Sequence, residues 1–186
     1  MPNWCENRVE IRGPLALLEK LQQAFNEGCL FQSIDPQPEA LMGQAPFIAN
    51  NKDDEERKQA LISQYGAADW YDWRLAHWGT KWDVDPSDST SVLNANGCCM
   101  YATLMTAWGP PMGIFNTLHM RGYNVKAWWW EPGMMFCGMY INGESHDMDI
   151  PASHDLALET LPGGILSKFP ILDMLHESEQ SQKAEQ

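Results

Sequence analysis

The side chains with the greatest capacity for chemistry are tryptophans that alternate with polar and charged residues. Four tryptophans fall within thirteen residues of the segment 70–84, together with one His, two Asp, one Arg and one Lys. Tryptophan buries a large apolar area, and its indole N–H requires a hydrogen-bond partner when it is buried. Apolar walls with a few polar groups are typical of sites for small ligands or peptides. This segment therefore indicates binding chemistry.

Signatures of catalysis and of metal or phosphate binding are missing from the sequence. It contains no GxxxxGK, GxGxxG, GxSxG or HExxH motif. The His and Asp residues in 144–149 and 154–155 match no metal-ligand spacing, and the acidic residues after Trp82 lack the Gly and Glu of a calcium loop. Five cysteines without CxxC spacing are interpreted as reduced thiols. We therefore expect no cofactor and no metal.

Acidic residues outnumber basic residues by 25 to 12, which gives a formal net charge of −13. Nucleic-acid binders need clustered Lys and Arg to contact phosphates, so direct binding of DNA or RNA is not expected. No apolar run reaches the length of a bilayer span, and the first residues lack the apolar core of an export signal. We expect a cytoplasmic protein without a membrane segment.

The elements that must position the tryptophans follow from apolar periodicity. Alternation over 7–12 predicts a strand, and leucines at helical spacing predict a helix over 14–26. The segment 29–51 carries three prolines and is predicted to be irregular. The remaining predicted helices are 53–65, 70–76, 112–120, 156–161 and 165–177, the last interrupted by Pro170. The remaining predicted strands are 82–84, 89–93, 98–107, 125–130, 134–141 and 147–150.

Without the irregular excursion, this order is β-α-β-β-α-β, which predicts an α+β fold of the ferredoxin-like type with an antiparallel sheet. A helical insertion after the first helix spans about 28–78, and the hairpin strand after Pro132 extends one edge of the sheet. We therefore predict a ferredoxin-like domain over 1–150 and a C-terminal helical extension over 151–186.

Three short segments resemble a known family. These are Met-Pro-Asn-Trp-Cys-Glu-Asn at 1–7, Trp-Gly-Thr-Lys-Trp-Asp at 78–83, and Glu-Pro-Gly at 131–133 followed by Phe-Cys-Gly at 136–138. They are similar to the YubB ferredoxin-like family, which is found on enterobacterial plasmids and phages and carries a domain of unknown function. The resemblance covers residues 1 to about 150. It implies the ferredoxin-like fold and a mobile-element setting, and it supplies no activity and no catalytic residue.

The predicted topology brings distant segments to one end of the sheet. The first two strands run parallel with the third antiparallel between them, so the segments 3–7 and 78–83 share an end with 108–109 and 130–131. We expect this rim to form a binding site from Asn3, Trp4, Asn7, Trp78, Thr80, Lys81, Trp82, Asp83, Trp108 and Glu131.

Structural roles for the same rim residues remain open. The tryptophans can instead close the end of the core, while the amide and hydroxyl groups satisfy loop backbone. Lys81 can form a simple ion pair with Asp83 and Glu131.

Three hypotheses about function remain open. The first is a non-enzymatic module that binds a small ligand or a protein. The second is an acidic mimic of nucleic acid that occupies the basic groove of another protein, which only the charge and the family setting motivate. The third is a hydrolase that uses Asp83 and Glu131 as acid and base. Separately, Cys5 and His77 are considered as a nucleophile pair at the rim.

Overall fold

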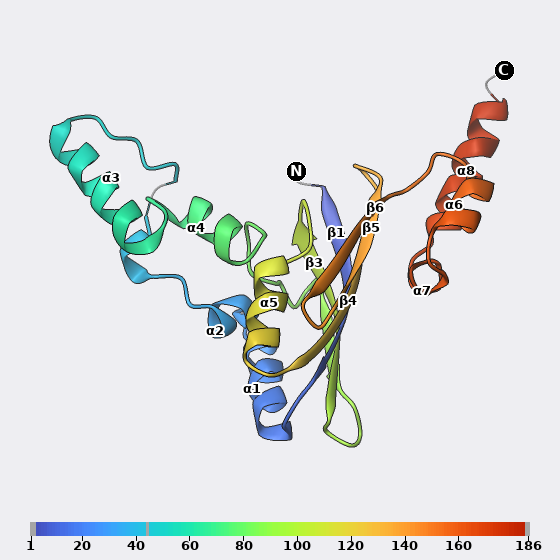
Figure 1. Ribbon diagram of the computed structural model, residues 1–186, viewed down its shortest axis with the longest axis horizontal. Coiled ribbons are helices and arrows are strands. Elements are labelled where there is room, and N and C mark those ends of the chain that lie inside the picture. The colour runs from blue at the N-terminus through green and yellow to red at the C-terminus, as the bar shows by residue number, and fades with distance from the viewer. Residues whose placement is uncertain (1–2, 44, 185–186) are drawn as a thin grey trace.

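The chain folds around one antiparallel sheet, shown in the computed structural model of Figure 1, which describes residues 3–43 and 45–184. Six strands lie in the order β2-β3-β1-β4-β5-β6, so chain neighbours β1 and β2 are separated by β3. The strands are β1 (Trp4–Arg12), β2 (Thr90–Leu93), β3 (Cys99–Ala107), β4 (Asn124–Glu131), β5 (Phe136–Ile141) and β6 (Glu144–Asp149).

Helices connect the strands and extend the fold on both sides of the sheet. Between β1 and β2 lie α1 (Leu15–Asn26), α2 (Leu30–Ile34), the short 3-10 helix η1 (Glu39–Leu41), α3 (Lys52–Tyr65) and α4 (Trp70–His77). Between β3 and β4 lies α5 (Met112–Met120), and after β6 follow α6 (His154–Thr160), α7 (Gly163–Leu166) and α8 (Ile171–Ala184).

The two faces of the sheet carry two apolar clusters. Alternation along β1 turns Val9 and Ile11 into the main core, with α1 and α5, and turns Arg8 to the opposite face. On that opposite face, α6–α8 build a second cluster that includes Cys137 of β5. Figure 1 shows α1 and α5 on one side of the sheet, α6–α8 on the other, and α3 projecting as an arm. The C-terminal helices therefore share the sheet as their packing surface.

The α+β class and most of the predicted elements are confirmed. The helices over 14–26, 53–65 and 112–120 correspond to α1, α3 and α5, and the insertion contains α2, η1, α3 and α4. The strand predicted at 147–150 is longer and forms β6, and Pro170 separates α7 from α8. Within the described ranges, no helix is both long enough and apolar enough to span a bilayer.

The strand predicted at 82–84 is wrong, because this segment is irregular. The carboxylate of Asp83 accepts backbone N–H groups from Phe31, Gln32 and Val84 at 2.8–2.9 Å. Asp83 therefore holds the start of α2 against the loop before β2. The chain enters the sheet later, at Thr90.

Candidate functional site

Aromatic side chains from four separate segments meet at the end of the sheet where β1 begins. Trp4 of β1 lies 6.1 Å from Trp82, measured between ring centroids, and Trp82 lies 6.4 Å from Trp108, which follows β3. Tyr71 of α4 meets Trp108 edge-on at 6.4 Å. The ammonium nitrogen of Lys81 lies 4.4–5.7 Å from the rings of Tyr71, Trp82 and Trp108, within the range of cation–π attraction. We call these five residues the aromatic rim.

The three tryptophans of the aromatic rim are far from buried. Trp4, Trp82 and Trp108 retain 40%, 37% and 42% of their accessible surface. Burial of apolar area stabilises a fold, and a residue that only closes the core would be covered by its neighbours. Contiguous exposed apolar surface instead marks places where ligands or partners bind. The rim thus has the exposure expected of a contact surface.

Trp108 adopts a backbone conformation that bulky residues rarely occupy. Its φ angle is +68°, in the left-handed region, where the Cβ atom crowds the backbone. The surrounding hydrogen bonds hold it there: its N–H donates to the Asn3 carbonyl at 2.9 Å, and the Thr106 hydroxyl donates to the Gly109 carbonyl at 2.8 Å. Strained residues of this kind cluster at functional sites. Trp108 thus combines a strained backbone with an exposed ring.

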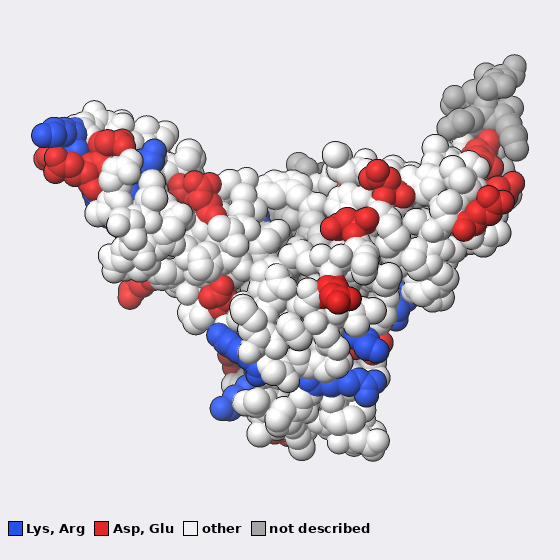
Figure 2. Space-filling view, in the orientation of Figure 1, with Lys and Arg blue, Asp and Glu red and all other residues white. Residues whose placement is uncertain are grey.

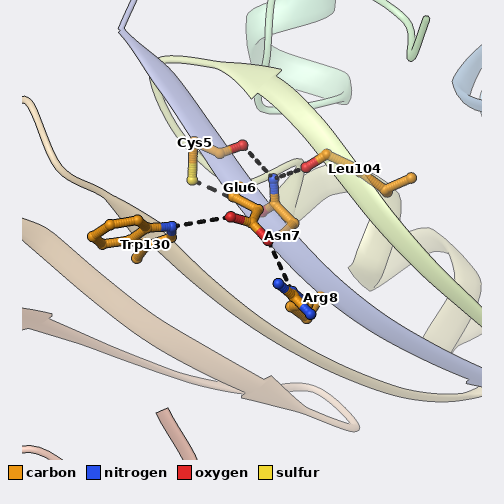
Figure 3. A network of polar contacts seen from close by, with 6 residues as sticks. All are labelled: Cys5, Glu6, Asn7, Arg8, Leu104 and Trp130. Carbon is orange, nitrogen blue, oxygen red and sulfur yellow. Dashed lines mark hydrogen bonds and ion pairs between the residues drawn. The ribbon is translucent and has the colours of Figure 1, made fainter. Parts of the chain in front are cut away.

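Buried polar side chains fix the backbone beneath the aromatic rim. Figure 3 shows Asn7, whose amide nitrogen lies 3.0 Å from the Cys5 carbonyl oxygen and 3.1 Å from that of Leu104. The same nitrogen lies 2.8 Å from the hydroxyl of Thr106. The Thr80 hydroxyl donates to the Ala107 carbonyl and accepts from the Ala107 N–H, at 3.0 and 3.1 Å. Asn7 and Thr80 therefore position the rim without reaching its surface.

Of the ten predicted site residues, five contribute side chains to the surface of this region, and the side chains of the other five make contacts within the fold. Asn3, Trp4, Lys81, Trp82 and Trp108 lie at the surface. The contacts of Asn7, Thr80 and Asp83 are described above. Trp78 and Glu131 also make their contacts inside the fold. Trp78 is fully buried against Phe31, and its indole N–H donates to the Asp35 carbonyl at 2.8 Å.

Glu131 is a turn residue. It is 1% exposed, and its carboxylate accepts the backbone N–H groups of Gly133 and Met134. Within the described ranges Lys81 forms no ion pair, and its ammonium group lies over aromatic rings. The alternative considered above, an ion pair of Lys81 with Asp83 and Glu131, is therefore not formed.

The residues considered for nucleophilic or metal chemistry have other roles. Cys5 is fully buried, and burial together with the nearby Glu131 carboxylate raises the pKa of its thiol far above the ordinary value. His77 stacks on Trp73 with ring centroids 4.0 Å apart, and its Nδ1 lies 3.1 Å from the Asp35 carboxylate. Cys5 and His77 thus have separate partners. In the part of the chain that the structure describes, no three His, Cys, Asp or Glu side chains converge to hold a metal ion.

Two hollows flank the aromatic rim and contain residues that sequence reasoning missed. A hollow of about 320 Å³ lies beside Trp82 and is lined by Gln37, Met42, Gly43, Trp70 and Arg74 as well. A larger hollow of about 650 Å³, which we call the β6 hollow, is lined by Asn3, Trp108, Met134, Phe136, Asp147, Met148 and Asp149. Arg74 lies in the tryptophan-rich segment, and its guanidinium carbon is 5.1 Å from the Trp70 ring. Nothing in the sequence around 147–149 signals its proximity to Trp108, which depends on the sheet order.

No family model matches the chain, and no curated protein matches it in sequence. Among solved structures it is similar to the crystal structure of a protein named Api92 from Yersinia pseudotuberculosis, described under the family DUF1281. The TM-score is 0.46 at 11% sequence identity, and the match covers 81% of this chain and 99% of that chain. This similarity assigns no ligand or activity.

Proposed function

We propose that the chain is a non-enzymatic binding module that holds a small ligand or a protein segment on the aromatic rim. The observation that carries the proposal is the contact of three tryptophans that keep about two-fifths of their surface exposed. The strained backbone of Trp108 and the buried polar groups under it supply the rigidity that a binding surface needs. Lys81 adds one cationic donor to an otherwise aromatic surface.

We also propose a fold type, a family and a cellular location for the chain. The strand order β2-β3-β1-β4, with α1 and α5 on one face, supports the ferredoxin-like type, to which β5 and β6 are added at the β4 edge. The segments at 1–7, 78–83 and 131–138 support membership of the YubB family and hence a plasmid or phage setting. We also propose a cytoplasmic location, which the five cysteines support because thiols remain reduced there.

Indole resonances provide a direct test of the aromatic rim. The chain has nine tryptophans, each with one indole N–H signal in a ¹H–¹⁵N spectrum of the labelled protein. We expect a panel of aromatic, sugar and short-peptide fragments to contain probes that shift the signals of Trp4, Trp82 and Trp108. The signals of the buried Trp73, Trp78 and Trp129 serve as internal controls and should stay in place. A panel that leaves all three rim signals unmoved would refute the proposal.

The two other functional hypotheses receive no support from the geometry. Asp83 and Glu131 each accept backbone N–H groups, and neither lines either of the two hollows. A hydrolase would need both carboxyl groups to face one cavity. For the nucleic-acid mimic, a continuous acidic stripe is required, whereas Figure 2 shows acidic side chains in separate patches on this face. The binding module is therefore the function that we carry forward.

A further inference from the structure

β6 is an open edge of the sheet. Among the described strands it is hydrogen-bonded only to β5, and five of its six residues are exposed. An edge strand presents unpaired backbone N–H and C=O groups, to which another extended chain can add by strand pairing. The feature is notable because this edge lies beside the aromatic rim, with Asn3 and Trp108 in the lining of the β6 hollow.

The register shows which residues of β6 turn their backbone outward. The Ile150 N–H donates to the Met135 carbonyl at 2.7 Å, so residue 150 faces β5. Residues along an antiparallel strand face alternate edges, so 144, 146 and 148 also face β5. Ser145, Asp147 and Asp149 therefore direct their N–H and C=O groups away from the sheet. An added strand would form its backbone hydrogen bonds with these three residues.

The side chains of these outward residues share one face of the sheet. Asp149 lies opposite Phe136, which packs against the main core, so Asp147 and Asp149 both lie on the α1 and α5 face. Within the described ranges neither carboxylate takes part in an ion pair. Beside them the β6 hollow offers the apolar surfaces of Met134, Phe136 and Trp108. Figure 2 shows acidic side chains along the course that β6 takes in Figure 1.

We propose that the β6 edge binds an extended segment of a partner protein that carries Lys or Arg at every second residue, adding it to the sheet as a further strand. Cross-strand neighbours on one face lie close enough for opposite charges to attract, so these cations would lie opposite Asp147 and Asp149. Their alkyl stems would cover the apolar wall of the β6 hollow. A second copy of this chain is disfavoured, because its β6 would bring like charges together and each copy carries a net charge of −13. The inference rests on the proposed function, because the β6 hollow includes Trp108 of the aromatic rim and the neighbouring Asn3.

The test uses the full chain and two fluorescein-labelled hexapeptides, Lys-Val-Lys-Thr-Lys-Val and Glu-Val-Glu-Thr-Glu-Val. We expect the lysine peptide to bind, and the double variant D147N/D149N to bind it roughly tenfold more weakly, because two cross-strand charge pairs are lost. The matched control E19Q/E159Q removes two exposed carboxylates from α1 and α6 and should bind within about twofold of the wild type. S145P removes one outward N–H and should also weaken binding, while its pairing with β5 is retained.

Amide hydrogen exchange supplies a readout that general charge attraction would not move. The lysine peptide should slow exchange at Ser145, Asp147 and Asp149, because these N–H groups would become hydrogen-bonded. Equal weakening in D147N/D149N and E19Q/E159Q would overturn the inference, as would absence of binding or binding of the glutamate peptide. Binding that shifts rim indole signals but is indifferent to both β6 variants would overturn this inference and leave the proposed function standing. The fragment panel judges the proposed function independently of any peptide result.

Discussion

At the scale of single residues, tryptophans that look alike in the sequence occupy two different environments. Trp82 is 37% exposed, whereas Trp78, four residues earlier, is fully buried. The sequence motif Trp-Gly-Thr-Lys-Trp-Asp predicted both as site residues. Trp4, Trp82 and Trp108 do meet at one end of the sheet, although Trp82 lies in a loop and not in the expected strand. Which side chain is covered could not be predicted, because that depends on Phe31 and Asp35 of the irregular insertion.

A residue-scale prediction concerns Cys137 and pH. Burial, with Asp147 and Asp149 adding to it, raises the pKa of this thiol from 9.0 to about 11. Below pH 9 the thiol is protonated in both the folded and the unfolded chain. As the pH rises from 9 towards 11, the unfolded chain ionises first, so the free energy of unfolding should fall. Urea unfolding of wild type and Cys137→Ala from pH 8 to 11 measures this, and the variant should lose less stability across that range. Parallel profiles would contradict the assignment.

At the scale of elements, the long regular segments were predictable and the insertion was not. α1 and α5 carry apolar residues at helical spacing, and β3 and β4 alternate or run apolar, so local pattern and tertiary burial agree. The loop at 82–84 was mistaken for a strand. A three-residue alternation of apolar and polar residues also occurs in a loop whose central carboxylate caps a helix elsewhere in the fold. The order of β5 and β6 at the β4 edge followed from the hairpin turn, while the nearness of β6 to Trp108 followed only from the structure.

An element-scale prediction concerns the close approach of α4 and α5. A Cβ atom at Gly113, in the first turn of α5, would overlap with the carbonyl group of His77 at the end of α4. Gly113→Ala should therefore separate the two helices and destabilise the fold by about 1–3 kcal/mol, as overpacking does. Gly163→Ala is the matched control, because a Cβ there meets nothing within 4 Å. Thermal unfolding should separate the variants clearly, and equal melting temperatures would show that α4 and α5 are not held this closely.

At the scale of the whole molecule, charge is distributed unevenly. Figure 2 shows Lys and Arg gathered in the lower part of the molecule and on the arm formed by α3, and acidic side chains on that arm, over the sheet and over the C-terminal helices. Composition alone predicted the excess of 13 negative charges but not this distribution, which arises from how the elements pack. The aromatic rim lies at the end of the sheet where β1 begins, and it includes Tyr71 of α4.

A whole-molecule prediction follows from the net charge. Like charges repel one another in the compact state, and the Debye length falls from about 30 Å at 0.01 M salt to about 10 Å at 0.1 M. The melting temperature should therefore rise when NaCl is increased across this range. The E19Q/E159Q variant, with two fewer negative charges, should show a smaller rise. A melting temperature that falls with salt in the wild type would mean that attractive ion pairs outweigh the repulsion.

The most direct test of the central claim compares Trp82→Ala with Trp78→Ala. If the aromatic rim is a binding surface, Trp82→Ala should leave thermal stability nearly unchanged and abolish binding of fragments that shift the rim indole signals. Trp78→Ala, in the core, should cost about 3–5 kcal/mol, the range for a buried aromatic side chain replaced by alanine. A loss of that size from Trp82→Ala, with fragment binding retained by the folded fraction, would show that the rim tryptophans close the core and would contradict the account.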